Sequence, residues 1–72
     1  MPDQIKRSVT IKGHKTSISL EAPFWEALKD IAAIEGLSVN ALTAKIDNAP
    51  HTGGLSSAIR IYILNHYRQN AR

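Results

Sequence analysis

The sequence contains no cysteine in its 72 residues, which excludes disulfide bridges and thiolate metal sites. It has no apolar run of membrane-spanning length and no charged-then-apolar leader, so a cytoplasmic protein without a membrane partner is expected. A chain this short buries a modest fraction of its surface and usually needs disulfides, a metal or further subunits for stability. Association with another chain is therefore the expected route.

Signs of catalysis are also missing. The three histidines, His14, His51 and His66, are scattered, and there is no His-x-x-x-His pair or cluster of acids that would suit a metal ion. Serine and threonine are plentiful, but none lies in a recognisable nucleophile motif with an orienting base. The sequence therefore predicts no catalytic residue, no metal site, no cofactor and no enzyme activity.

Acidic residues are few near both ends of the chain. Residues 1–15 carry four basic side chains against one acid, and residues 48–72 carry three arginines and no acid, whereas residues 21–47 are mainly acidic. The net charge is +3. Basic flanks of this kind suit a polyanionic partner such as nucleic acid, although basic tails also serve solubility alone.

One short strand is expected over residues 15–20, because polar and apolar residues alternate there and place Ile18 and Leu20 on one face. The outward positions are Lys15, Ser17 and Ser19. A single strand in a helical chain leaves its backbone N–H and C=O groups without partners. The simplest solution is a second copy, which predicts an antiparallel ribbon formed between the two chains of a homodimer.

Residues 9–11 are a second strand candidate. Val9 and Ile11 occupy odd positions while the apolar residues of the first strand are even, so one unbroken strand would send them to opposite faces. A hairpin around Gly13 and His14 would pair Ile11 with Thr16, but it would also place Lys12 opposite Lys15. We therefore expect residues 1–12 to be a flexible or bulged basic arm, with the hairpin as the alternative.

Three helices are expected after the strand. The first covers residues 23–35 and ends at Gly36, because glycine enters the left-handed conformation without strain. The second is capped by Ser38 and ends before Pro50. Residues 50–54 form a linker, and a third helix over residues 55–68, within the C-terminal region 55–72, is expected to be capped by Ser56. The expected inward residues of the first two helices are Phe24, Ala27, Leu28, Ile31, Ile34, Val39, Leu42 and Ile46.

The third helix is apolar around much of its circumference, which one packed side does not explain. We expect the partner chain to cover part of it. Its apolar residues are Ala58, Ile59, Ile61, Tyr62, Ile63, Leu64 and Tyr67.

The order of strand, helix, glycine-containing turn and serine-capped helix resembles the ribbon-helix-helix family of DNA-binding proteins. Thr16–Leu20, Pro23–Glu35 and Gly36–Asn40 carry the resemblance, and the core it defines is residues 13–49. Ser17-Ile-Ser-Leu-Glu21, Phe24-Trp25 and Leu55-Ser-Ser-Ala-Ile-Arg60 resemble a small bacterial subgroup of ribbon-helix-helix-domain proteins. The fold implied is mostly α with one short strand, an intertwined homodimer and an added third helix.

The resemblance also implies a function, a sequence-specific transcriptional regulator, expected to be a repressor, whose dimeric ribbon enters the major groove of an inverted repeat. Lys15, Ser17 and Ser19 would touch bases. Phosphates would be held by the start of the second helix and by the arm, through Ser38, Val39, Asn40, Lys12, Arg7 and Lys6. Glu21, the next outward position, would repel phosphates.

Two other functions use the same scaffold. Trp25 could form one wall of a pocket for a small-molecule effector, with Asp47 and Arg60 holding the ammonium and carboxylate of an amino-acid-like ligand. Such a ligand sensor, or a protein-binding module, would bind DNA weakly. The third alternative is an antitoxin whose tail binds a toxin, although such tails are generally polar and fold on binding.

Overall fold

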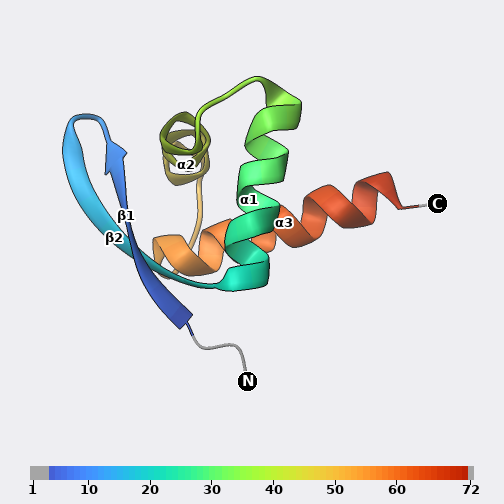
Figure 1. Ribbon diagram of the computed structural model, residues 1–72, viewed down its shortest axis with the longest axis horizontal. Helices are drawn as coiled ribbons and strands as arrows, with labels where there is room; N and C mark the ends of the chain where they lie inside the picture. Colours follow the sequence, from blue (N-terminus) through green and yellow to red (C-terminus); the bar gives the residue numbers. More distant parts are fainter. Residues whose placement is uncertain (1–3, 72) are drawn as a thin grey trace.

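A β-hairpin opens the chain in the computed structural model, which describes residues 4–71. Strand β1 (Gln4–Ile11) pairs antiparallel with β2 (His14–Glu21), with Ile11 opposite His14. Lys12 and Gly13 form the connecting turn with φ of 52° and 80°. Positive φ at both turn residues gives a type I′ turn, whose twist matches that of the strands. The hairpin curves along one side of the molecule (Figure 1).

The second strand corrects the expected architecture. Residues 4–11, which we expected in a flexible or bulged arm, are strand β1, while residues 1–3 of that arm lie outside the described residues. Because β1 supplies the hydrogen-bonding partner of β2 within one chain, the ribbon is complete without a second molecule. The prediction that a lone strand requires another copy was therefore wrong.

The hairpin also resolves the conflict of parity. Each odd-numbered residue of β1 faces an even-numbered residue of β2, so Val9 and Ile11 share one face with Ile18 and Leu20. All four side chains are buried. The alternative hairpin considered from the sequence had the correct faces, but its register was two residues away from the observed one, since Ile11 pairs with His14 rather than Thr16.

Three helices follow: α1 (Ala22–Glu35), α2 (Val39–Asn48) and α3 (Leu55–Asn70). Helix α1 ends at Gly36, whose φ of 72° is left-handed, and Ser38 caps α2 by accepting a hydrogen bond from the N–H of Ala41 at 3.0 Å. Both predictions of helix boundaries are confirmed. None of the helices in the described residues is long and apolar enough to cross a membrane.

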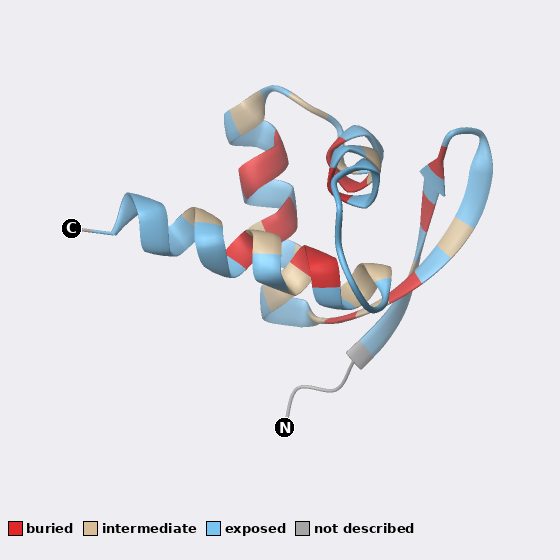
Figure 2. Ribbon diagram, turned by 180° about the vertical axis from the view of Figure 1, so that it is seen from behind, coloured by how far each residue is buried: buried red, intermediate tan, exposed pale blue. Residues whose placement is uncertain are grey.

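The hydrophobic core lies between the inner face of the hairpin and the three helices. Figure 2 shows the buried segments gathered on these facing surfaces. The residues that contribute most are Ile18, Leu20, Leu28, Ile31, Leu42 and Ile59, all at most 1% exposed. One expected core residue lies outside: Ile34 is 70% exposed, and Ala32 is buried instead.

Helix α3 is covered on one side only. Ala58, Ile59 and Ile63 are buried, whereas Ile61 is 55% exposed and Leu64 54% exposed. The C-terminal half of the helix extends past α1, away from the hairpin (Figures 1 and 2). A single chain therefore leaves part of the apolar surface of α3 open to solvent.

Candidate nucleic-acid interface

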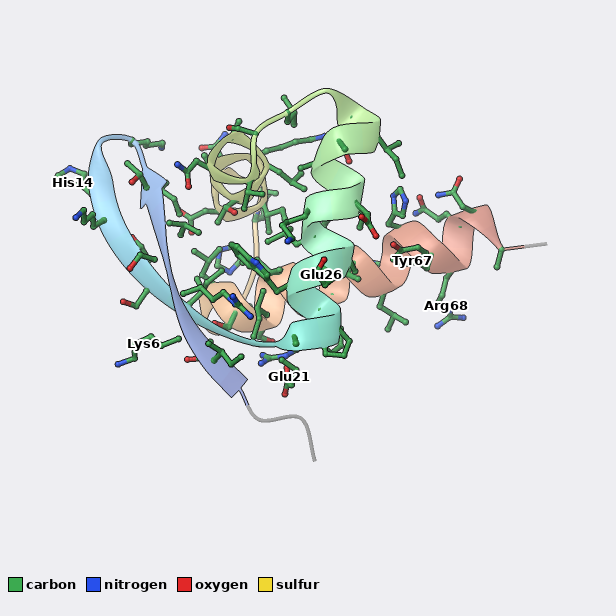
Figure 3. The ribbon with its side chains drawn as sticks, in the orientation of Figure 1. Lys6, His14, Glu21, Glu26, Tyr67 and Arg68 are labelled. Atoms are coloured by element: carbon green, nitrogen blue, oxygen red, sulfur yellow. The ribbon has the colours of Figure 1, made fainter. Side chains whose placement is uncertain are left out.

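The outward face of the hairpin is polar and contains residues from both strands. Cross-strand pairs place Lys6 opposite Ser19, Ser8 opposite Ser17 and Thr10 opposite Lys15. Five of these six residues are exposed and Ser19 is half-buried, and Lys6 points away from the helices (Figure 3). We call these six residues the hairpin outer face. The sequence indicated its β2 half, but the β1 half was missed, although Lys6, Ser8 and Thr10 alternate with Arg7, Val9 and Ile11.

The electrostatics of the hairpin suit an anion. Residues 5–20 include two lysines on the outer face and Lys12 at the exposed turn, and they contain no acid. Glu21, at the end of β2, binds Arg60 of α3, whose Nη2 and Nε donate to Oε1 at 3.1 and 3.2 Å. The carboxylate that we expected to repel phosphates is therefore paired with a cation.

Side chains from two helices hold the outer edges of the hairpin. The N–H of Thr10 in β1 donates to Oδ1 of Asn40 in α2 at 3.1 Å. The N–H of Ser19 in β2 donates to Oγ of Ser56 in α3 at 3.0 Å, and Nη2 of Arg60 donates to the Ser19 carbonyl at 2.9 Å. These bonds fix the hairpin relative to the helices, and such preorganisation lowers the cost of binding.

Ser56 therefore has a different role from the expected one. Gly54 is the N-cap residue of α3, and no side chain caps this helix. The hydroxyl of Ser56 satisfies a strand N–H that would otherwise lie part-buried without a partner.

Arg7 lies on the inner face of the hairpin, because it shares the parity of Val9. Its guanidinium carbon is 4.8 Å from the centre of the Trp25 ring, a cation–π contact, and its Nε is buried with no hydrogen-bond partner. Lys6 and Lys12, the other two basic residues expected to contact phosphates from the arm, are exposed. Lys6 and Lys12 are therefore accessible to a phosphate, whereas Arg7 faces the inner side of the hairpin.

The start of α2 lies beside the hairpin, because Asn40 binds the edge of β1. Ser38 uses its side chain to cap the helix, and the N–H groups of Val39 and Asn40 have no acceptor within a helix that begins at residue 39. The expected phosphate-binding turn and the hairpin outer face therefore belong to one continuous region. The positive end of the α2 dipole adds to the favourable potential there.

The profile of the family described as "Ribbon-helix-helix domain" matches residues 4–67. The chain belongs to the ribbon-helix-helix family. This match includes β1 and nearly all of α3, both of which lie outside the core of residues 13–49 that the sequence suggested. Ribbon-helix-helix domains are typically non-catalytic and DNA-binding.

One solved structure supports the same fold. The present ribbon-helix-helix chain is similar to an uncharacterized protein from Bordetella pertussis Tohama I, with a TM-score of 0.78 and 29% sequence identity. The match covers 94% of the present chain. It spans 58% of the length of that protein. No curated protein matches the sequence.

The three residues considered for an effector pocket have separate surroundings in this ribbon-helix-helix domain. Trp25 packs against Arg7, Asp47 lies 3.4 Å from Nε2 of His51, and Arg60 binds β2. One hollow in the described residues lies between the end of α2 and α3, and another includes Arg60; neither is lined by Trp25 or Asp47. The described residues contain no cluster of histidines and acids suited to a metal ion.

A polar cluster joins the three helices through Glu35 at the end of α1, Lys45 of α2 and Tyr62 of α3. Lys45 of α2 donates to Oε1 of Glu35 at 2.7 Å, and the Tyr62 hydroxyl of α3 donates to Oε2 of the same carboxylate. The hydrogen bond from Lys45, followed by that from Tyr62, lowers the pKa of Glu35. Burial and the bond to Glu35 raise the pKa of Tyr62. This cluster is a structural link between helices rather than part of the hairpin outer face.

Proposed function

We propose that this ribbon-helix-helix chain binds double-stranded DNA by placing the hairpin outer face in the major groove, as a sequence-specific regulator of transcription. The observation that carries the proposal is the exposed, acid-free outer face of a hairpin whose edges are fixed to α2 and α3. The major groove is about 12 Å wide and admits a two-stranded ribbon. One chain supplies such a ribbon, and a homodimer would present two of them to an inverted repeat.

The roles of individual residues follow from their positions. Lys15, Ser17 and Ser19 of β2 would face base edges together with Ser8 and Thr10 of β1. Lysine suits guanine acceptors, whereas serine and threonine hydroxyls pair with more than one base. Sequence choice would therefore depend most on Lys15 and on Lys6, the two long donors of this face.

Phosphate contacts would come from positions around the outer face. Lys12 is exposed at the turn, and the N–H groups of Val39 and Asn40 lie at the start of α2, next to the edge of β1. Ser38 would keep those groups in place through its cap. Arg7 would act through Trp25 as support for the hairpin, since its guanidinium lies on the inner face.

Selection of bound duplexes from random DNA at physiological salt tests the proposal. Enrichment of an inverted repeat is the expected result, and its affinity should fall with salt by roughly 0.9 logarithmic units per logarithmic unit of salt for each phosphate contact. No enrichment together with a flat salt response would reject DNA as the partner.

A matched pair of lysines tests the face that is used. Lys15→Ala should weaken binding to the selected site strongly, because Lys15 is on the outer face. Lys29→Ala removes the same charge from α1, where Lys29 pairs with Glu26 at 3.1 Å, and should have little effect. Equal losses would show that charge alone, and not the hairpin, determines binding.

A further inference from the structure

The two strands of the hairpin carry the same six-residue pattern. Residues 6–11 of β1 read Lys-Arg-Ser-Val-Thr-Ile, and residues 15–20 of β2 read Lys-Thr-Ser-Ile-Ser-Leu. Lysine and serine recur at the first and third positions, and the last three positions keep an aliphatic residue, a hydroxyl and an aliphatic residue. The second position alone changes its chemistry, from Arg7 to Thr16, and it lies on the inner face. The chemistry of the hairpin outer face is therefore the same in both copies.

The register of the hairpin converts this repeat into a two-fold relation. Ser8 lies opposite Ser17, and these two serines are equivalent in the two copies. Because the strands are antiparallel, half a turn about an axis between the serines exchanges one copy with the other and brings Lys6 to the position of Lys15. One chain therefore has an approximate two-fold axis through the centre of its outer face, without a second subunit.

The attachment of the hairpin to the helices follows the same axis. Thr10 and Ser19 are equivalent in the two copies, and each donates its backbone N–H to a helix side chain. The acceptor for Thr10 is Asn40, the second residue of α2, at 3.1 Å. The acceptor for Ser19 is Ser56, the second residue of α3, at 3.0 Å. Two helix starts thus fix equivalent positions on opposite edges, which keeps the outer face symmetrical in its support as well as in its side chains.

We propose that the outer face of a single chain recognises a DNA element that is itself a short inverted repeat, with Lys6 and Lys15 on guanines of opposite strands. The inference rests on the proposed DNA-binding function and specifies the class of sequence that it reads. The symmetry of a DNA site mirrors the two-fold symmetry of the protein bound to it. Here that symmetry lies within one hairpin, so it applies inside each half of any larger site that two chains would share.

The spacing of the two lysines sets the size of the element. Each lysine lies two residues from the central serine of its strand, on opposite sides of the axis. At about 3.4 Å per residue, their Cα atoms are roughly 14 Å apart along the ribbon. Base pairs follow one another about every 3.4 Å, so the lysines span about four base-pair steps. Since lysine suits guanine while the hydroxyls between the lysines accept more than one base, the outer guanines should be the most strongly specified positions.

The repeat could also serve the hairpin alone. Alternating polar and aliphatic residues form strands in general, and lysine on an exposed edge prevents pairing with other chains. Lysines with only that role would affect solubility and would give no preference for any base. The deciding measurement is therefore the preference for individual bases at equivalent positions of the element.

Base substitutions in the duplex enriched by random selection provide the test. Replacing either guanine of the pair should weaken binding of the wild type by a similar factor, roughly tenfold. Lys6→Ala should become indifferent to one of these replacements and Lys15→Ala to the other, both with an unchanged circular dichroism spectrum. Lys12→Ala is the matched control, because Lys12 is exposed at the turn and lies outside the repeat. It should weaken binding to all duplexes alike.

The outcomes separate this inference from the proposed function. The inference would be overturned, with DNA binding still standing, if the two lysine variants relaxed positions unrelated by a local inverted repeat. A Lys6→Ala variant that behaved like Lys12→Ala would overturn it in the same way. The absence of any enriched duplex, together with a flat salt response, would overturn both.

Discussion

The chain contains the same tripeptide, Gly-Leu-Ser, at the start of two of its helices, and the two serines have different roles. Ser38, after Gly36 and Leu37, caps α2 by bonding to the N–H of Ala41 three residues later. Ser56, after Gly54 and Leu55, lies within the first turn of α3 and bonds to Ser19, 37 residues away. Identical local sequence thus serves a helix end in one place and the edge of a strand in the other.

The difference comes from what lies next to each helix start. Helix α2 uses its own serine for the cap and contacts β1 through Asn40. Helix α3 begins beside β2, where the N–H of Ser19 needs an acceptor, and Arg60 one turn later binds the carbonyl of the same residue. Each helix start therefore fixes one edge of the hairpin, but with different residues.

Among the substitutions that test this comparison, Arg60→Ala should lower the free energy of unfolding most. It removes three hydrogen bonds between α3 and β2, and leaves the Ser19 carbonyl and Glu21 without this partner. We expect a loss of about 2 kcal/mol in the free energy of unfolding, because bonds to charged groups contribute more than neutral ones. Urea unfolding measures the loss. A change below about 0.5 kcal/mol would mean that α3 does not hold the hairpin through Arg60.

Ser38→Ala should cost about 1 kcal/mol, the usual effect of losing a helix N-cap. The N–H of Ala41 loses its acceptor, so hydrogen exchange should accelerate at the start of α2 and remain unchanged at the start of α3. Ser38→Asp is the matched variant, since it keeps an acceptor at the cap and should retain stability. If Ser38→Asp is as unstable as Ser38→Ala, capping is not the reason.

Ser56→Ala should cost somewhat less, roughly 0.5–1 kcal/mol, because one neutral hydrogen bond is lost. Hydrogen exchange should accelerate at the N–H of Ser19 in β2, not at the start of α3. This pattern distinguishes a strand-edge role from a cap. Faster exchange confined to residues 56–58 would restore the capping role that we expected from the sequence.

The sequence predicted features whose causes lie within a few residues. Gly36 ends α1 because of its own left-handed conformation, and Ser38 reaches an N–H three residues away. The role of Ser56 depends on residue 19, which no local pattern reveals. For the same reason, the sequence located the outward residues of β2 but not the contacts of Arg60 with Glu21 and Ser19.

The hairpin was set aside because the register considered for it placed Lys12 opposite Lys15, whereas in the structure Thr10 lies opposite Lys15 and Lys12 is a turn residue. Counted along a single strand, Val9 and Ile18 belong to opposite faces; folded back at Lys12 and Gly13, they share one. Lysine is an unusual residue for the first left-handed turn position, where asparagine or glycine is common, so the turn had a weak local signal. Pairing with β1, rather than any property of β2, removed the need for a second chain to complete the ribbon.

The smallest predicted effect concerns pH and the cluster of Glu35, Lys45 and Tyr62 that joins the helices. Since hydrogen bonds from Lys45 and Tyr62 lower the pKa of Glu35, its contribution to stability is present above the ordinary carboxyl pKa and is lost as pH falls through the lowered value. The raised pKa of Tyr62 gives a contribution present below about pH 10 that is lost as pH rises further.

Thermal unfolding of the wild type and Glu35→Gln across pH tests this. The difference in Tm between the two proteins should be present at neutral pH and shrink in acid, because the wild-type carboxylate becomes protonated there. The Ser38 and Ser56 variants should show no such convergence. A difference that persists unchanged in strong acid would exclude the carboxylate as its source.

Because the ribbon is formed within one polypeptide, its formation need not depend on protein concentration. When strands are exchanged between subunits, folding and assembly are a single event, and stability cannot be separated from protein concentration. Here the two-residue turn brings neighbouring segments together, a contact that forms quickly and locally. The hairpin can therefore form on a newly made chain, before that chain meets another molecule.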